Sequence, residues 1–177
     1  GPNLIWSRPG IVVDVAFGEF PDGEQMGSSA AGAQNAIDEW QVQARRILKA
    51  IGWSAEELIW RIHPTGMSLA LSAPIDALYA GIEVGEWAWR STAEVLAGRE
   101  ELPLQDSDEL KSMQDAIAKE QDPKLLTLHA AAQEHKVNFC GDDEWTTIGM
   151  GCNGQTWGTT EPPEASEVNW DAISDIP

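Results

Sequence analysis

The sequence predicts an α+β fold, in which a small antiparallel sheet packed by two helices is followed by a second, smaller helix-plus-hairpin segment. The first observation is an order of strand, helix, hairpin and helix over residues 1–98. The second is an apolar fraction of 42% in 177 residues, which is enough for a real core. Nine tryptophans are many for this length, and most are expected inside that core.

A strand and a helix open the predicted order. The β-branched run IVVDVAF at 11–17 predicts a buried strand. Residues 18–32 are rich in turn formers and are expected to be mobile. A helix is predicted over about 34–51, ended by Gly52. Its apolar residues recur at steps of three and four: Ile37, Trp40, Ala44, Ile47, Leu48 and Ile51.

Residues 57–74 predict a β-hairpin. Leu58, Trp60 and Ile62 alternate with polar neighbours, and the same alternation returns after the turn at 64–66. His63 stands at the end of the first strand, directly before the proline, and is interpreted as a turn residue rather than a ligand.

A second helix is predicted over about 74–97, with Ser72 as its cap, Pro74 in its first turn and Gly98 at its end. The stripe expected to face the core is Ile75, Leu78, Tyr79, Ile82, Trp89, Ala93 and Leu96. A second line of small residues consists of Ala77, Gly81, Gly85 and Ala88. Each helical glycine costs about 1 kcal/mol against alanine, so this line indicates that another backbone approaches closely.

The acidic, proline-containing segment 99–109 is the predicted linker between a first domain at 1–98 and a second segment at 110–177. Helices are predicted near 108–120 and 123–135, with strands at 137–140 and 145–150 and a turn at the GDDE stretch between them. The second segment is therefore a pair of helices followed by a hairpin.

Gly149, Gly151 and Gly154 reproduce the spacing of the dinucleotide-binding fingerprint. That fingerprint works only where a helix opens at the third glycine. The residues that follow, QTWGTTEPP, alternate and end in two prolines, so they cannot open a long helix. The glycines therefore predict a turn between antiparallel strands, with 155–159 as the return strand; a phosphate contact is the less favoured alternative.

The formal net charge of −18 repels phosphate backbones and anionic lipid, which argues against nucleic-acid and membrane partners. No apolar run approaches membrane-spanning length, and no signal peptide is evident. Cys140 and Cys152 lack a C-x-x-C pattern and are expected to be free thiols in a reducing cytoplasm. The acidity itself has two explanations, solubility or attraction of a cationic ligand.

Charged and aromatic residues on the second helix form the candidate ligand-binding site: Asp76, Tyr79, Glu83, Glu86 and Arg90. Such acids and aromatics can hold the amine or guanidinium of an amino acid or peptide. The alternative is structural, because Glu86 falls almost on the apolar stripe and Arg90 stands four residues later as a natural ion-pair partner. No nucleophile or metal accompanies these carboxylates, so no catalytic residue is predicted.

Four stretches in order resemble the N-terminal region of cyanophycin synthetase-like proteins of the Mur ligase family: GPNLIWSRPG, LALSAPIDALYAGIEVGEWAWRSTAEVLAG, TIGMGCNGQTW and VNWDAISDIP. The resemblance covers nearly the whole chain. It implies an accessory region of an ATP-dependent amide ligase, which holds substrate or docks against a Mur ligase-type catalytic domain. ATP and Mg would belong to that parent protein.

The resemblance has two limits within these residues. No G-x-x-x-x-G-K-[ST] loop occurs, so no cofactor is predicted for this chain. Many of these relatives carry H-x-x-E-H on the second helix, where this chain has no histidine, so no metal site is predicted; His63, His129 and His135 are expected on different elements. The alternatives are a stand-alone acidic binding or assembly module and, less favoured, a hydrolase.

Overall fold

The computed structural model describes residues 5–19, 30–141, 145–158 and 162–173. Its fold is α+β, as predicted, and its contacts divide the chain into two units, with the boundary between Glu120 and Gln121. The predicted linker at 99–109 therefore lies inside the first unit. Most of the loop predicted at 18–32, together with part of the predicted GDDE turn, falls outside the described residues.

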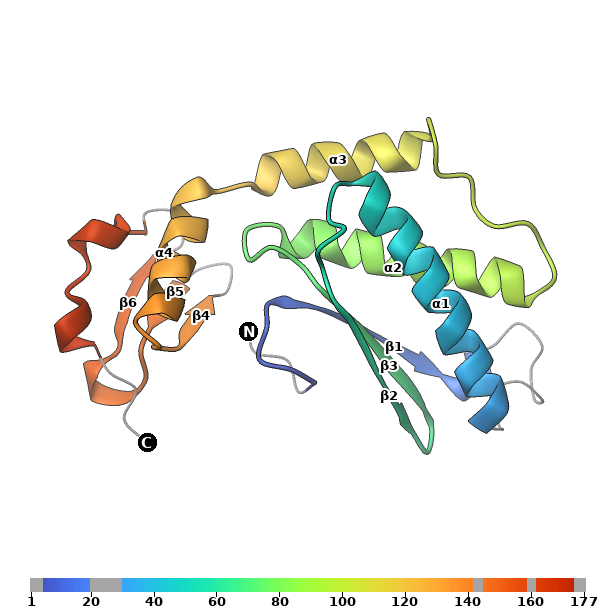
Figure 1. The fold of residues 1–177 in the computed structure, drawn as a ribbon, viewed down its shortest axis with the longest axis horizontal. Helices are drawn as coiled ribbons and strands as arrows, with labels where there is room; N and C mark the ends of the chain where they lie inside the picture. The colour runs from blue at the N-terminus through green and yellow to red at the C-terminus, as the bar shows by residue number, and fades with distance from the viewer. Residues whose placement is uncertain (1–4, 20–29, 142–144, 159–161, 174–177) are drawn as a thin grey trace. The chain divides into compact units, whose positions relative to one another are not determined.

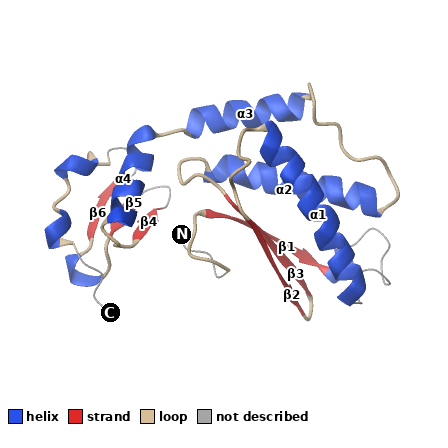
Figure 2. Ribbon diagram, viewed as in Figure 1, coloured by secondary structure: helices blue, strands red, loops and turns tan. Residues whose placement is uncertain are grey.

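The first unit is built on an antiparallel three-stranded sheet in the order β1-β3-β2. The strands are β1 (Gly10–Ala16), β2 (Leu58–His63) and β3 (Gly66–Ser72). Helices α1 (Ala30–Ala50) and α2 (Leu78–Leu96) cover one face of this sheet (Figure 1; Figure 2). The predicted hairpin is confirmed, and so is the helix before it.

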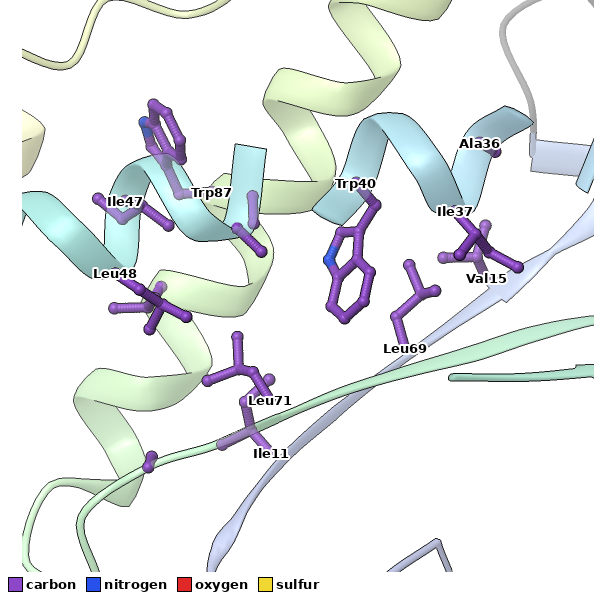
Figure 3. Close-up of a cluster of buried hydrophobic side chains, with 14 of the residues drawn as sticks. Ile11, Val15, Ala36, Ile37, Trp40, Ile47, Leu48, Leu69, Leu71 and Trp87 are labelled. Atoms are coloured by element: carbon purple, nitrogen blue, oxygen red, sulfur yellow. The ribbon is translucent and has the colours of Figure 1, made fainter. Parts of the chain in front are cut away.

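The core of the first unit lies between the two helices and the sheet (Figure 3). Leu69 and Leu71 of β3 point toward the helices, as does Ile11 of β1. Trp40 of α1 points toward these strands, whereas Trp87 of α2 points away from them, and both are almost completely buried (Figure 3). Because strand residues alternate between the two faces, a single apolar face of each strand meets the helices.

Helix α2 begins at Leu78, four residues later than predicted, and Ser72 is not its cap. The Ser72 hydroxyl is engaged at the sheet instead, where it accepts the backbone N–H of Glu57 (2.8 Å) and donates to the Glu56 carboxylate. Ala77 holds the cap position and supplies no side-chain hydrogen bond. The first turn of the helix is thus capped from elsewhere in the chain, as described below.

The face of α2 that enters the core includes the line of small residues, whereas only Leu78, Trp89 and Leu96 of the predicted stripe pack against the core, and these are partly buried. Tyr79 and Ile82 of that stripe are 56% and 45% exposed, whereas Gly81 and Gly85 are buried. A Cβ at Gly85 would lie 2.4 Å from Cδ1 of Ile11. The predicted approach of another backbone is therefore wrong, because side chains of β1 fill the space that larger residues at Gly85 would need.

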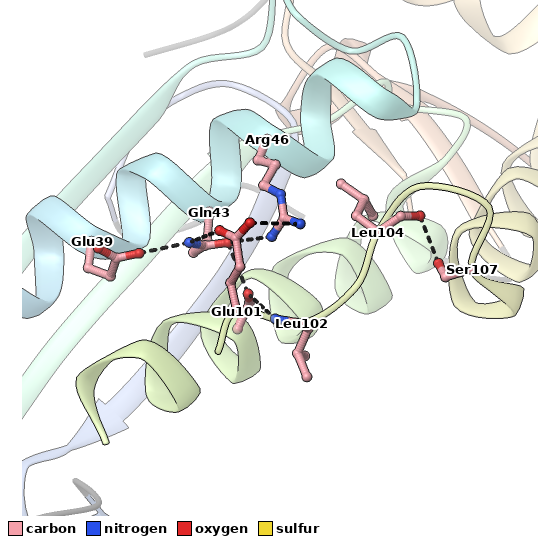
Figure 4. A network of polar contacts seen from close by, with 8 residues as sticks. Glu39, Gln43, Arg46, Glu101, Leu102, Leu104 and Ser107 are labelled. Carbon is pink, nitrogen blue, oxygen red and sulfur yellow. Dashed lines mark hydrogen bonds and ion pairs between the residues drawn. The ribbon is translucent and has the colours of Figure 1, made fainter. Parts of the chain in front are cut away.

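A buried polar network ties the segment after α2 to both helices (Figure 4). Gln43 of α1 is 1% exposed; its amide donates to Glu39 and Glu101 at 2.7 and 3.3 Å, and its carbonyl accepts from Arg46 and from Ser91 of α2. The Ser91 hydroxyl in turn accepts the backbone N–H of Leu102 (3.2 Å). Because the buried amide is satisfied on both sides, the acidic segment is held as part of the first unit.

Helix α3 (Asp108–Glu120) completes the first unit and runs antiparallel to α2. Glu109 near its start pairs with Arg90, and Glu120 at its end bonds the first turn of α2. Its buried Met113 joins the core of the unit.

The second unit combines α4 (Pro123–Glu134) with a small antiparallel sheet in the order β4-β5-β6. The strands are β4 (Phe139–Gly141), β5 (Trp145–Ile148) and β6 (Gln155–Gly158). Two short 3-10 turns follow, Ala165–Glu167 and Trp170–Ala172. Among the described residues its buried apolar cluster is small and consists of Leu128, Ala132, Ile148, Val168 and Ile173, and Thr146 is buried as well.

The glycine segment is the predicted turn between β5 and β6. Gly149 and Gly151 have positive φ (77° and 74°), a short 3-10 turn spans Gly151–Asn153, and the return strand begins at Gln155. Glycine is required here because other residues rarely adopt these angles. This geometry agrees with the prediction that the three glycines form a turn and only coincide with the spacing of the dinucleotide-binding fingerprint.

Helices in both units end in the same backbone motif, but with different residues. After α1 and α2, Gly52 and Gly98 adopt φ of 86° and 72°, which confirms both predicted ends. After α4 the corresponding residue is Lys136, with φ of 57°. Its N–H donates to the Gln133 carbonyl and that of Val137 to the Ala132 carbonyl, the paired bonds of a Schellman motif.

Candidate functional site: an acidic surface at the start of α2

The first turns of α2 carry a surface that combines exposed apolar and acidic side chains. We call it the α2 acidic surface; it consists of Asp76, Tyr79, Ile82, Glu83, Glu86 and Glu120. On a helix, residues three and four apart are neighbours, so Tyr79 lies beside Ile82 and Glu83, and Ile82 lies beside Glu86. Asp76, directly before the helix, is 6% exposed.

Glu120 gives this surface its shape, because it caps the start of α2 from the end of α3. Its two carboxylate oxygens accept the backbone N–H groups of Tyr79 (3.1 Å) and Ala80 (2.8 Å). A carboxylate at a helix N-terminus interacts favourably with the helix dipole and satisfies otherwise free donors. The bond replaces the side-chain cap that Ala77 cannot supply.

The carboxylates of this surface act on one another. Desolvation by burial raises the pKa of Glu120 above its usual value, the Ala80 N–H opposes that rise, and the charges of Glu83 and Asp76 add to it. Glu83 and Asp76 thus each disfavour the ionised form of the Glu120 carboxyl. Among the described residues, neither Glu83 nor Glu120 takes part in an ion pair.

Two of the predicted site residues play other parts than expected. Arg90 pairs with Glu109 of α3 (3.2 Å) and not with Glu86. Glu86 is exposed rather than set in the apolar stripe, since the buried face of α2 is rotated toward the small residues. The predicted structural pair Glu86–Arg90 is therefore wrong, and Arg90 is tied to α3 about three turns beyond Tyr79.

The sequence interpretation missed Glu109 and Glu120, because both act through a helix–helix contact that sequence spacing cannot show. One signal was present. Glu120 is the last residue of α3, where an acidic side chain meets the negative end of the helix dipole. An acid in that position suggests a partner outside its own helix, which here is the N-terminus of α2.

The remaining residues singled out in the sequence lie elsewhere. His63 ends β2, whereas His129 and His135 share one element, α4 and its C-cap, instead of lying on separate ones. The His129 ring meets Phe139 edge-on at 5.1 Å, and burial lowers the pKa of His129. His135 stacks on Trp170 at 4.7 Å. Cys140 and Cys152 are free and exposed, as expected.

A preformed pair of exposed apolar side chains beside several carboxylates can bind an alkyl-ammonium or guanidinium group. The carboxylates supply charge and hydrogen-bond acceptors, and the ring of Tyr79 supplies a face for the cation. Within the described ranges no group of three or more His, Cys, Asp or Glu side chains is arranged to hold a metal ion. None of the helices described there combines the length and apolarity needed to cross a bilayer.

No family model matches the chain, and no curated protein matches it either. The Mur ligase-like resemblance therefore remains a proposal.

Proposed function

We propose that the chain is a binding region that holds a cationic amino acid or peptide on the α2 acidic surface. In this proposal it is the N-terminal accessory part of a cytoplasmic, ATP-dependent amide ligase of Mur ligase type. The catalytic domain of that ligase would use ATP and Mg, and the chain itself would bind substrate or dock against that domain.

One observation carries the binding proposal. The Glu120 carboxylate caps the start of α2, where the charges of Glu83 and Asp76 act on it, and none of the ion pairs among the described residues includes Glu83 or Glu120. Beside them Tyr79 and Ile82 expose about half of their surface. A ligand with a positive group on an alkyl chain would relieve the repulsion among the carboxylates and cover the apolar pair at the same time.

A stand-alone assembly module, with no ligase domain, is the second candidate. The same exposed pair of Tyr79 and Ile82 favours it, since apolar side chains rimmed by charge also suit a basic protein segment. The two candidates differ in what presents the cation: a free amino acid or peptide in the first, a folded partner in the second.

Calorimetry with lysine- and arginine-containing dipeptides tests the binding proposal. We expect dissociation constants of about 0.1–1 mM, which correspond to roughly 4–5.5 kcal/mol of binding free energy. Raising the salt concentration should weaken binding, because exposed charges are screened. Glu83→Gln should weaken it by about 1 kcal/mol or less, the range of exposed charge pairs.

The matched control is Glu134→Gln, which removes the same charge from an exposed position on α4. It should leave the affinity unchanged. If no dipeptide produces heat with the folded chain, or if both variants weaken binding equally, the α2 acidic surface is not the binding site.

A further inference from the structure

Strand β2 forms one edge of the sheet in the first unit. Among the described residues it pairs with β3 alone, and β1 lies on the opposite edge. An edge strand presents unpaired backbone N–H and C=O groups along its outer side, which is a template for another strand. What could pair with β2 depends on which of its residues point outward.

The hydrogen bonds at the end of the hairpin identify those residues. The Ser72 N–H donates to the Glu57 carbonyl (2.9 Å), so these two opposed residues are a hydrogen-bonded pair. In an antiparallel ladder such pairs alternate with non-bonded ones. The outward-facing backbone groups of β2 therefore belong to Leu58, Trp60 and Ile62.

These same residues carry apolar side chains that the unit covers only in part. Trp60 is 37% exposed and Ile62 is 42% exposed. Natural edges are usually protected by charge, proline or a bulge, and the outward residues of β2 offer none of these. On β1 the same alternation turns Gly10, Val12, Asp14 and Ala16 outward, and the exposed Asp14 carboxylate protects that edge.

We propose that β2 pairs with β2 of a second copy of this chain, antiparallel and around a two-fold axis at Trp60. Only residues whose backbone N–H and C=O groups face outward can form hydrogen bonds with the second copy. Trp60 is such a residue, whereas Arg61 and Ile59 direct these groups toward β3, so the pairing must place Trp60 in a hydrogen-bonded pair. With Trp60 opposite itself, Leu58 lies opposite Ile62 of the second copy. All three outward positions of each strand then find an apolar partner.

The charged side chains favour this register over the registers that are shifted by one residue. On the other face of the strands it places Glu57, which also pairs with Arg8 of its own chain (2.7 Å), diagonal to Arg61 of the second copy, and opposite charges at such positions are favourable. Moving the axis to Arg61 would set two guanidinium groups against each other. Moving it to Ile59 would leave Ile62 opposite Glu56 of the second copy. Arg61 takes part in none of the ion pairs described within one chain, which leaves it available.

Sedimentation equilibrium of the whole chain tests the pairing. The mass should rise toward twice 19.3 kDa as the protein approaches roughly 0.5 mM. Association should strengthen with salt, because each copy carries a net charge of −18, whereas binding of a cationic dipeptide weakens with salt. A chain that stays monomeric at every concentration and salt level overturns the proposal.

Two substitutions locate the interface. Trp60→Pro removes an N–H that the fold itself does not use, and should raise the dissociation constant of the dimer by about 10- to 100-fold. Val12→Pro removes the equivalent outward N–H on β1 and should leave the dimer intact. Trp60→Lys, which keeps the backbone unchanged, should also abolish the dimer by placing two ammonium groups across the axis. A dimer that survives Trp60→Lys, or that is lost equally with Val12→Pro, contradicts pairing at β2.

Oxidative cross-linking tests the register. In a Cys140→Ser, Cys152→Ser background, Trp60→Cys should form a disulfide between copies, because paired Cα atoms on the axis lie about 5.5 Å apart. Arg61→Cys should cross-link far less, since its partner is Ile59 of the second copy. Faster cross-linking at residue 61 would overturn the proposed axis.

Discussion

The two units of this chain differ in the size of their buried cores and in the residues that end their helices. The unit that ends at Glu120 buries two tryptophans between two helices and a sheet, and it satisfies a buried glutamine with partners from three segments. The unit that begins at Gln121 has five buried core residues and ends its helix with a lysine in the left-handed region. The first unit is therefore better suited to hold a binding surface rigidly, because its core fixes α2.

Large-to-small changes in the two cores should separate the units most strongly. Trp87→Ala should lower the free energy of unfolding of the first unit by about 3–5 kcal/mol, and Leu128→Ala should lower that of the second by about 2–5 kcal/mol. Trp87→Phe is the control, because it keeps most of the volume and removes only an indole N–H that has no hydrogen-bond partner among the described residues.

Amide hydrogen exchange read segment by segment measures both effects in the whole chain. Trp87→Ala should reduce protection in α1, α2 and β3 and leave α4 and β5 as in the parent. Equal loss of protection in both units would show that the chain unfolds as one cooperative body, and the comparison would fail.

Substitutions at the positive-φ residues that follow the helices should change the stability of each unit by a smaller amount. Lys136→Gly should stabilise the second unit by about 1 kcal/mol, because a non-glycine residue in the left-handed region is strained. Gly98→Ala should destabilise the first unit by a similar amount, since no atom lies within 4 Å of the added Cβ and only the backbone angle opposes it. Thermal unfolding of both variants checks the signs. Two changes of the same sign would show that the helix ends do not differ as described.

A pH dependence confined to the second unit is the smallest expected effect. Burial lowers the pKa of His129, so the unfolded chain binds its proton more readily than the folded one. The stability that this residue contributes is complete above its ordinary pKa of about 6.5 and is lost as the pH falls through the lowered value. His129→Leu should flatten that decline in chemical denaturation between pH 7 and pH 5. An unchanged slope would mean that His129 titrates alike in both states.

Local patterns in the sequence were sufficient for much of the fold. The periodicity of α1, the alternation of the hairpin and the glycines at 52 and 98 depend on neighbours in the chain, and the structure confirms them. The start of α2 was misplaced because its cap comes from Glu120, about forty residues away. Its buried face was misassigned because small residues pack closely on β1, a contact that outweighs the larger apolar side chains.

The sequence predicts the types of side chain at the candidate site but not the contacts that they make with α3. Tyr79, Glu83 and Glu86 do lie on one part of α2, since helical spacing sets that arrangement, and Asp76 lies two residues before the helix. The role of Arg90 and the presence of Glu120 at the site depend on how α3 packs against α2. The periodicity of the sequence does not predict this packing. The sequence predicts a linker over 99–109 for the same reason, because the hydrogen bonds that tie this segment to Gln43 and Ser91 are non-local.

The affinity for a cationic dipeptide as a function of pH tests the central claim most directly. The pKa of Glu120 is raised, so this carboxyl loses its proton above the ordinary range of a glutamate, and a bound cation favours the ionised form. Affinity in the wild-type chain should therefore keep rising above about pH 4.3, where an ordinary glutamate is already half ionised. In Glu120→Gln the rise should end at lower pH and the final affinity should be weaker. An affinity that is independent of pH over this range, or a profile identical in the two chains, would contradict the assignment of the α2 acidic surface as the cation-binding site.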